Sequence, residues 1–234
     1  MSGSADIPKL FIMLITYMKM LPEEGPIDNV SAAMYNGSLE VPMKLLRLTL
    51  LVLVAFGVAH AQTIDLGQDV FINNEGPIVV CVDAGVAVRK LDKPYVMFMV
   101  FMGAKGDGNF SVNRDGVVMV YKGQEYKMPS VEEWRQEYRG ANNDIELYIR
   151  LGKESLALSQ MRFWSYPWNY DFFPVLGRGP LPSNQVSMSG NLGARTKVYF
   201  KNPGFQKGDE FVIKVTDHNN PEVVGLCAVV LDPK

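Results

Sequence analysis

The stretch YVMFMVFM, from Tyr95 to Met102, decides the fold of this chain. All of its residues are apolar, Pro94 precedes it, and Gly103 follows it. The run is short for a buried helix, but it has the ordinary length of a strand. Because successive side chains of a strand point to opposite faces, a strand without polar residues has to be covered on both faces. We therefore predict a central β-strand over residues 95–102.

Other strand-like runs lie on both sides of this stretch, and turn residues such as Gly, Pro, Asn and Asp separate many of them. Short strands with turn signals every 8–12 residues or so are typical of an antiparallel sandwich or barrel. The sequence therefore predicts a mainly β fold, with a single antiparallel β-sandwich-like (or partly open barrel) domain over residues 62–234 and one or two short helices. The other predicted strands cover residues 69–72, 78–89, 110–113, 117–121, 124–128, 195–201, 210–217 and 223–231, and we expect 223–231 to be among the most buried.

Several of these runs carry finer predictions. Gly85 inside the run 78–89 indicates a bulge. The turn Arg114-Asp115-Gly116 predicts a hairpin between the runs that flank it. In 195–201, Lys197, Tyr199 and Lys201 alternate with Val198 and Phe200, which indicates a half-exposed strand. Another β-like run begins at residue 156.

One helix is well signalled over residues 131–139. Ser130 can cap its first turn, and Glu133 three residues later completes the pattern of a capping box. Gly140 fits the left-handed residue that ends many helices. A second segment, 143–151, is either a short helix or, over 145–149, a strand, and periodicity leaves both interpretations open.

The stretch from Met43 to Ala61, MKLLRLTLLVLVAFGVAHA, has the three parts of a secretory signal. Lys44 and Arg47 form a basic start, an uncharged apolar run follows from residue 48 to 58, and Ala59-His60-Ala61 supplies small residues for cleavage. We expect cleavage before Gln62 and a periplasmic or secreted product. The alternative is a retained membrane helix, but the apolar run falls short of the roughly 20 residues that a span requires.

Residues 1–42 precede this signal and receive no fold or function assignment. Secretory signals lie at the N-terminus of a protein, so a translation start at Met43 or Met34 would leave the preceding residues outside it. The other interpretation is a cytoplasmic extension. Removal of the first 61 of the 234 residues leaves 173, which is the size of one domain.

The charge balance of residues 62–234 excludes some partners. Basic and acidic residues are almost equal in number, 19 and 20, and they are mixed along the sequence. A nucleic-acid-binding domain carries a basic footprint, and a membrane-surface segment carries a polybasic cluster. We therefore expect no nucleic-acid partner and, after cleavage, no membrane span or patch.

Two cysteines, Cys81 and Cys227, lie in apolar, strand-like runs of the expected mature domain. In an exported protein they are candidates for one disulfide, which would close a loop of roughly 145 residues and add about 5 kcal/mol of stability. The alternative is that both are small, reduced core residues.

The expected mature domain has few residues of the types that serve catalysis or metal binding. His218 is the only histidine after residue 61, and it stands among turn residues, so we expect an exposed turn histidine. A zinc site would need more ligands, and no Gly-x-Ser-x-Gly motif is present. The glycines at 103, 106 and 108 match no phosphate-binding spacing. The acidic turns at 107–109 and 217–222 lack the spacing of a calcium loop. We predict no metal, no cofactor and no catalytic group of these kinds.

An aromatic block, FWSYPWNYDFF, covers residues 163–173. Exposed Trp and Tyr rings serve as stacking platforms or interface anchors, which makes Trp164, Tyr166, Trp168 and Tyr170 the candidate binding residues. The alternative is that these rings cover one end of the core.

Two function classes therefore compete. The first is an exported, non-enzymatic binding or envelope-associated domain whose partner is a protein or a glycan. The second is a small extracytoplasmic hydrolase that uses carboxylates such as Glu133, Glu137 or Asp171. A cleft that brings two carboxylates together beneath an aromatic wall would favour the hydrolase.

Overall fold

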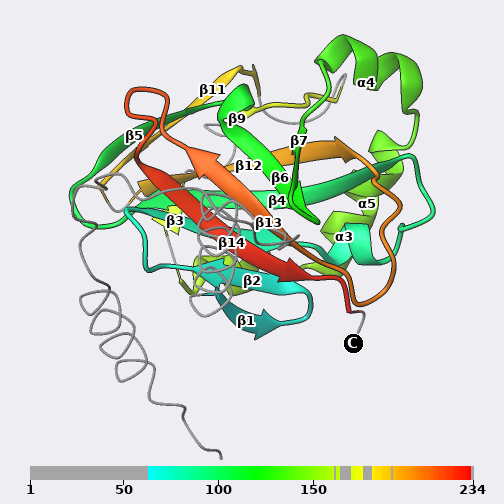
Figure 1. The fold of residues 1–234 in the computed structure, drawn as a ribbon, viewed down its shortest axis with the longest axis horizontal. Coiled ribbons are helices and arrows are strands. Elements are labelled where there is room, and N and C mark those ends of the chain that lie inside the picture. Colours follow the sequence, from blue (N-terminus) through cyan, green and yellow to red (C-terminus); the bar gives the residue numbers. More distant parts are fainter. Residues whose placement is uncertain (1–62, 161, 164–169, 176–180, 191, 233–234) are drawn as a thin grey trace, which may run out of the picture. The chain divides into compact units, whose positions relative to one another are not determined.

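The computed structural model describes residues 63–160, 162–163, 170–175, 181–190 and 192–232. The chain divides into two compact units, Met1–Met43 and Lys44–Lys234, and all of the described residues belong to the second. They form a mainly β, sandwich-like fold of two antiparallel sheets with short helices, which confirms the predicted fold class (Figure 1). Within the described residues neither sheet closes into a barrel.

The larger sheet contains the central strand predicted from the sequence. This strand, β4 (Tyr95–Ala104), lies between β3 (Ile78–Asp83) and β12 (Leu192–Lys201). Beyond β3 come β2 (Val70–Asn73) and the edge strand β1 (Thr63–Gly67). On the other side, beyond β12, come β11 (Gln185–Ser189) and β5 (Asn109–Asn113), and the short β8 (Arg162–Phe163) pairs with β12 in parallel.

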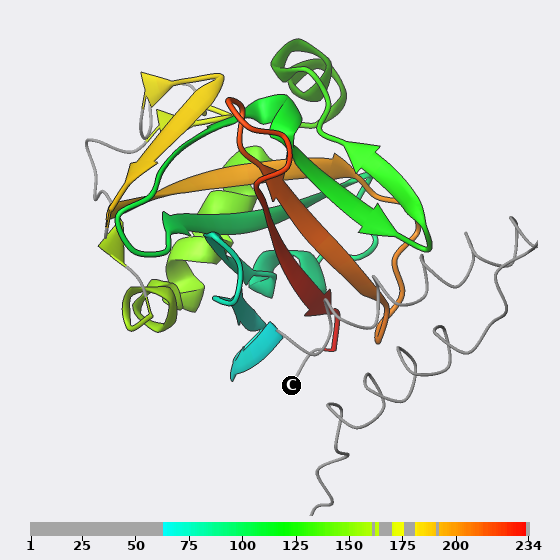
Figure 2. The same ribbon diagram turned by 60° about the vertical axis from the view of Figure 1, so that its left-hand side comes forward.

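The smaller sheet has the order β14-β13-β6-β7. Its strands are β6 (Val117–Tyr121), β7 (Gln124–Lys127), β13 (Glu210–Thr216) and β14 (Val224–Val230). Figures 1 and 2 show β13 and β14 running obliquely across β4 and β12. A separate parallel pair joins β9 (Tyr170–Asp171) to β10 (Leu181–Pro182).

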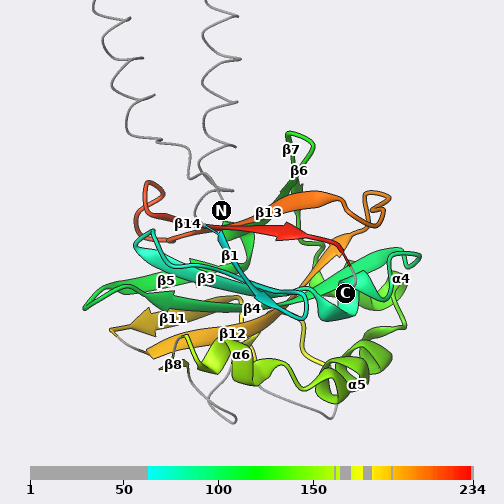
Figure 3. The same ribbon diagram turned by 90° about the horizontal axis from the view of Figure 1, so that it is seen from below.

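The α-helices of the described residues are α3 (Gly85–Val88), α4 (Val131–Glu137), α5 (Ala141–Leu151) and α6 (Glu154–Leu158). Figure 3 shows the order of the layers, with β13 and β14 first, then β3, β4 and β12, and then α5 and α6. The central sheet is therefore covered on both faces, as an apolar strand at its centre requires.

The two faces of the central sheet have separate aromatic cores. The register pairs Phe98 with Val198, and the Phe98 ring lies 4.9 Å from that of Phe211 in β13. The next residue along β12, Tyr199, faces the other way, and its ring lies 4.9 Å from that of Trp134 in α4. Every residue of β4 up to Gly103 is buried. The prediction of a central strand covered on both faces is confirmed.

Helix α4 also agrees with the sequence, except at its end. The Ser130 hydroxyl accepts a hydrogen bond from the Glu133 backbone N–H at 3.0 Å, which is one half of the predicted capping box. The Glu133 carboxylate pairs with Lys201, 2.7 Å away. Gly140, however, has a φ of −83° and is not left-handed. A Cβ atom at this position would lie 2.5 Å from the Tyr138 hydroxyl. Glycine is needed here for space rather than for conformation.

Three strand predictions were wrong. The run 78–89 ends as a strand at Asp83, whose carboxylate accepts a hydrogen bond from the Gly85 N–H at 2.8 Å and so turns the chain into α3. The run that begins at residue 156 lies in α6. In β12, Lys197 is buried, because its ammonium group pairs with Asp171. The segment 143–151, for which the sequence allows a helix or a strand, belongs to helix α5. Gly152 ends this helix with a φ of 60°.

The predicted hairpin around residues 114–116 does not form. Strand β5 pairs with β11 in the larger sheet, whereas β6 pairs with β13 in the smaller sheet. The 3₁₀ turn η1 (Arg114–Gly116) therefore carries the chain from one sheet to the other. Turn residues alone do not specify whether the strands that they join will pair.

Cys81 and Cys227 are free, buried thiols, so the disulfide alternative is not the one observed. At Gly225 the two sheets come so close that a Cβ atom would lie 2.7 Å from the Val80 side chain. Val80 thus faces β14, and the next residue, Cys81, points to the opposite face of the sheet. Burial raises the pKa of the Cys81 thiol to about 12. Among the helices of the described residues, none has the length and apolar character that crossing a membrane requires.

Candidate functional site

The aromatic binding residues proposed from the sequence are not tested. Trp164, Tyr166 and Trp168 lie outside the described residues, and of Tyr170 only the backbone is described, in β9. The block ends in Phe172 and Phe173, which are both fully buried in the core. The assignment of the four rings as a binding site remains a prediction.

The acids predicted for a hydrolase lie in two separate places. Glu133 and Glu137 both pair with Lys201 on the surface, at 2.7 and 3.4 Å. Asp171 is buried elsewhere, in contact with the Lys197 ammonium group. Burial raises the pKa of Asp171, and the charge of Lys197 opposes this shift. Each of these carboxylates already has a structural partner.

The turns rich in acids and amides also have structural roles. Both carboxylate oxygens of Asp217 accept backbone hydrogen bonds, from Ser111 at 2.8 Å and Asn220 at 3.0 Å. His218 is exposed, and its Nδ1 lies 2.9 Å from the Asn113 amide nitrogen. Across the described part of the chain, no group of three or more His, Cys, Asp or Glu residues could hold a metal ion.

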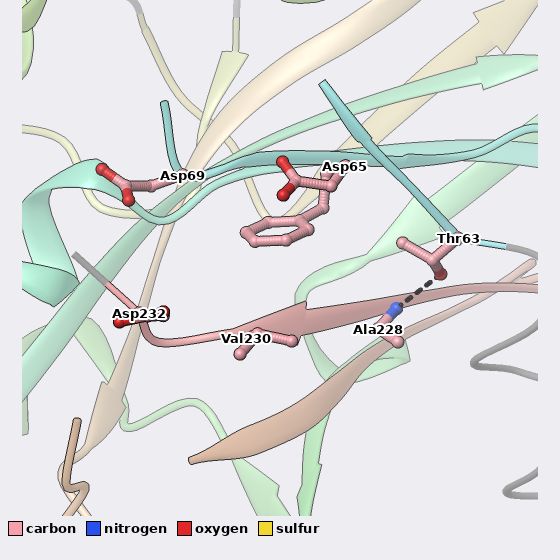
Figure 4. A pocket seen from close by; sticks show the side chains of 7 residues that line it. Thr63, Asp65, Asp69, Ala228, Val230 and Asp232 are labelled. Carbon is pink, nitrogen blue, oxygen red and sulfur yellow. Dashed lines mark hydrogen bonds between the residues drawn. The ribbon is translucent and has the colours of Figure 1, made fainter. Parts of the chain in front are cut away.

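A pocket of about 250 Å³ lies where the edge strands of the two sheets meet. We call it the seam pocket, because β1 is the last strand of the larger sheet and β14 the last strand of the smaller one. Thr63 spans the seam, and its hydroxyl accepts a hydrogen bond from the Ala228 backbone N–H at 3.0 Å (Figure 4). The pocket is lined by Thr63, Asp65, Asp69, Phe71, Ala228, Val230 and Asp232.

Three carboxylates surround this pocket. Figure 4 shows Asp65 and Asp69 on the β1–β2 side and Asp232 on the β14 side. Among the described residues that line it, none is a lysine or arginine. Phe71 and Val230 add apolar surface between the acids. The pocket thus combines carboxylates with an apolar floor. Two of these carboxylates have cationic partners, since Asp232 lies 3.5 Å from Lys207 and Asp69 contacts Lys153.

The turn that carries Asp69 is strained. Gly67, Gln68 and Asp69 follow one another with φ angles of 84°, 54° and 67°. A left-handed conformation is easy for glycine but costs roughly 1–2 kcal/mol at each of the other two residues. Strain of this kind persists only where the surrounding structure enforces it, and it gathers at binding and active sites.

Two cations, the buried Lys153 and the exposed Arg89, hold Asp69 in position. Its Oδ2 atom accepts hydrogen bonds from Lys153 Nζ at 2.7 Å and from Arg89 at 2.9 Å. Lys153 also donates to the backbone carbonyl of Gln68. The side chains of Lys153 and Asp69 are only 4% and 3% exposed, so water screens this contact weakly. We call this group the Asp69 clamp.

Asp83 completes the Asp69 clamp on its buried side. Its Oδ1 accepts the Gly85 N–H, while Oδ2 is buried and has no hydrogen-bond partner in the described part of the chain. Burial raises the pKa of Asp83, although the Gly85 N–H and Lys153 act in the opposite direction. A Cβ atom at Gly85 would lie 2.7 Å from Lys153 Nζ, so glycine is required for the lysine to fit.

The seam pocket contains none of the residues that sequence reasoning selected. Its walls come from opposite ends of the domain, so no local motif spans them. The only local signal was the sequence Gly67-Gln68-Asp69, a turn between two short strands. Comparisons with protein-family models, with curated proteins and with solved structures found no significant match to this chain.

Proposed function

We propose that residues 62–234 form an exported, non-enzymatic binding domain whose seam pocket takes a cationic group of a partner macromolecule. The signal-like stretch of residues 43–61 supports export, with cleavage before Gln62. The partner class expected from the sequence, a protein or a glycan, is narrowed by charge. A lysine or arginine side chain of a protein partner fits this site best.

The observation that carries this proposal is the combination of charge and shape in the seam pocket. Asp65 and Asp232 lie on opposite walls, with apolar side chains between them. Long basic side chains lay their methylene groups on apolar surface and place their charge among acids. Because the acids form no metal-binding group, an extended organic cation suits them better than a metal ion.

The seam pocket does place carboxylates beside an aromatic ring, the arrangement that we associated with a hydrolase. Its best-held acid, however, is unsuited to catalysis. The Oδ2 atom of Asp69 accepts hydrogen bonds from Lys153 and Arg89, which makes this carboxylate a weaker nucleophile or base. The Asp69 clamp fixes a charge in place, and this supports recognition rather than hydrolysis.

The proposal can be tested with a small probe, Nα-acetyl-lysine methylamide, titrated into the ¹⁵N-labelled mature domain. We expect the backbone amide signals of Ala228 and Val230 to shift as the pocket fills. The matched control is the same molecule acetylated on its side-chain nitrogen, which removes the charge and keeps the shape. Equal shifts from the charged and the neutral probe would contradict the proposal.

Substitutions of single acids show which side chains contribute to the affinity for the charged probe. Asp65→Asn and Asp232→Asn should each weaken binding of the charged probe about threefold to tenfold, because each removes one charge beside the ligand. Asp107→Asn changes an exposed acid in a distant loop and should leave the affinity unchanged. N-terminal sequencing of the native protein tests export separately, and a first residue other than Gln62 would contradict the cleavage that we propose.

A further inference from the structure

A second pocket, of about 290 Å³, lies where α4 is followed by α5. We call it the elbow pocket. It has no lining residue in common with the seam pocket, and its charge is opposite. It is lined by Trp134, Arg135, Tyr138, Arg139, Ala141, Asn142, Pro174 and Val175.

The elbow pocket is basic. Arg135 and Arg139 are exposed residues that line it, and no acidic residue lines it in the part of the chain that the structure describes. One guanidinium nitrogen of Arg135 donates to the Pro174 carbonyl at 3.3 Å, which holds this arginine against the pocket wall. A guanidinium group has several further N–H donors in a planar fork, and this fork matches the two oxygens of a carboxylate.

The first turn of α5 adds backbone donors. Ala141 and Asn142 are the first two residues of this eleven-residue helix, and both line the elbow pocket. The first N–H groups of a helix have no partner within the helix, and the helix dipole favours an anion beside them. The residue before the helix is Gly140, which has no side chain that could cap these N–H groups.

A buried donor in the wall of the same pocket lacks a partner. Trp134 is only 2% exposed and lines the elbow pocket, yet its indole Nε1–H has no hydrogen-bond acceptor among the described residues. A buried donor without a partner costs roughly 1–3 kcal/mol. A ligand that supplies an acceptor at this wall would recover that free energy.

We propose that the elbow pocket binds a small organic anion, namely a carboxylate carried on a single compact ring such as an acidic sugar. The two arginines, the α5 amides and the Trp134 indole would hold the carboxylate. Tyr138, Pro174 and Val175 supply flat, largely apolar surfaces for the face of a ring. The pocket volume is at the lower end of the range for small-molecule sites, which suits one ring. This inference does not depend on the function proposed for the seam pocket.

The test is a titration of the ¹⁵N-labelled domain with glucuronate, with glucose as the neutral control and inorganic sulfate as a bare anion. The Trp134 indole signal is assigned by its loss in Trp134→Phe. We expect glucuronate to shift this indole signal downfield and to shift the amides of Ala141 and Asn142. Glucose should leave all three signals in place, and sulfate should bind more weakly than glucuronate.

Substitutions at two exposed arginines provide a matched pair of variants. Their folding does not depend on whether Trp134→Phe folds. Arg139→Gln should weaken glucuronate binding about tenfold to a hundredfold, since it removes a charged donor from the site. Arg150→Gln changes an exposed arginine at the far end of α5 and should leave binding unchanged. Equal weakening in both variants, equal binding of glucose, or tighter binding of sulfate would each overturn the proposal.

Discussion

Two buried aspartates, Asp144 and Asp69, show how this molecule uses the same side chain for two purposes. Asp144 lies in the first turn of α5 and is 1% exposed. It accepts hydrogen bonds from Lys90 at 2.5 Å, from the Tyr138 hydroxyl at 2.8 Å and from the Tyr199 hydroxyl at 3.3 Å. Its backbone is helical, and its neighbours are one cation and two phenols.

Asp69 differs in every respect except burial. Lys153 and Arg89, which donate to its side chain, are both cations, and they share a single oxygen. Its backbone is left-handed, and the neighbouring Asp83 keeps one oxygen without a partner in the described residues. Asp144 is arranged for stability, because it ties α5 to the core. Asp69 is arranged to present a fixed carboxylate to a pocket, at some expense in strain.

The largest expected effect comes from breaking the Asp144 cluster. Asp144→Ala leaves Lys90 and two buried hydroxyls without their acceptor, so the free energy of unfolding should fall by about 4 kcal/mol. Urea unfolding followed by circular dichroism measures this change. Asp92→Ala, which removes an exposed acid paired with Lys93, is the control and should leave the midpoint unchanged. A small loss of stability in Asp144→Ala would contradict the view that Asp144 serves stability while Asp69 serves binding.

The Asp69 clamp should be weaker. Lys153→Met keeps the length of the side chain but removes the charge, and Asp69 retains Arg89 as a partner. We expect the free energy of unfolding to fall by about 3 kcal/mol. The loss should be smaller than for Asp144→Ala, because Asp69 keeps one cation whereas Asp144→Ala leaves three donors without their acceptor. The same urea titration compares the two variants. A larger loss from Lys153→Met would mean that the Asp69 clamp, too, exists mainly for stability.

A smaller effect of opposite sign is expected at the strained turn. Gln68→Gly should raise the free energy of unfolding by about 0.5 kcal/mol, since glycine adopts φ = 54° without strain but makes the unfolded chain more flexible. It should also weaken binding of the lysine probe, because Asp69 is then held less rigidly. Lys122→Gly relieves a similar φ of 49° in another turn and should leave probe binding unchanged.

The smallest effect concerns pH. Burial raises the pKa of Asp83 in the folded protein, so the folded state binds a proton that the unfolded state has released. The stability that this proton provides is fully present below the unfolded pKa, about 3.9, and is lost as the pH rises through the folded value. Asp83→Asn should flatten this decline when unfolding is measured at a series of pH values. An unchanged slope would contradict the assignment.

Part of the fold could be predicted from the sequence, because the residues that determine it lie close together in the chain. The uniformly apolar run of β4, the Ser130 cap of α4 and the β13 and β14 runs each carry their own signal within a few residues. The apolar pattern alone required that β4 be covered on both faces. These features depend on propensity and periodicity, which a sequence displays directly.

The features that escaped prediction depend on partners far away in the sequence. The alternating pattern predicts an exposed Lys197, but this residue is buried because Asp171, on another segment, pairs with it. The turn at residues 114–116 has the composition of a hairpin, but distant strands compete for β5 and β6. The seam pocket and the Asp69 clamp combine residues 63–89, 153 and 228–232, and no local pattern records that juxtaposition.

The hydrogen bond between Thr63 and Ala228 joins positions 165 residues apart and closes the first strand of the domain onto the last. A chain that emerges from a ribosome or a translocation channel N-terminus first presents β1 long before β14 exists. Contacts of such long range form slowly, after nearer elements have assembled. The seam pocket is therefore a late product of synthesis, and a chain that stops short of β14 lacks one of its walls.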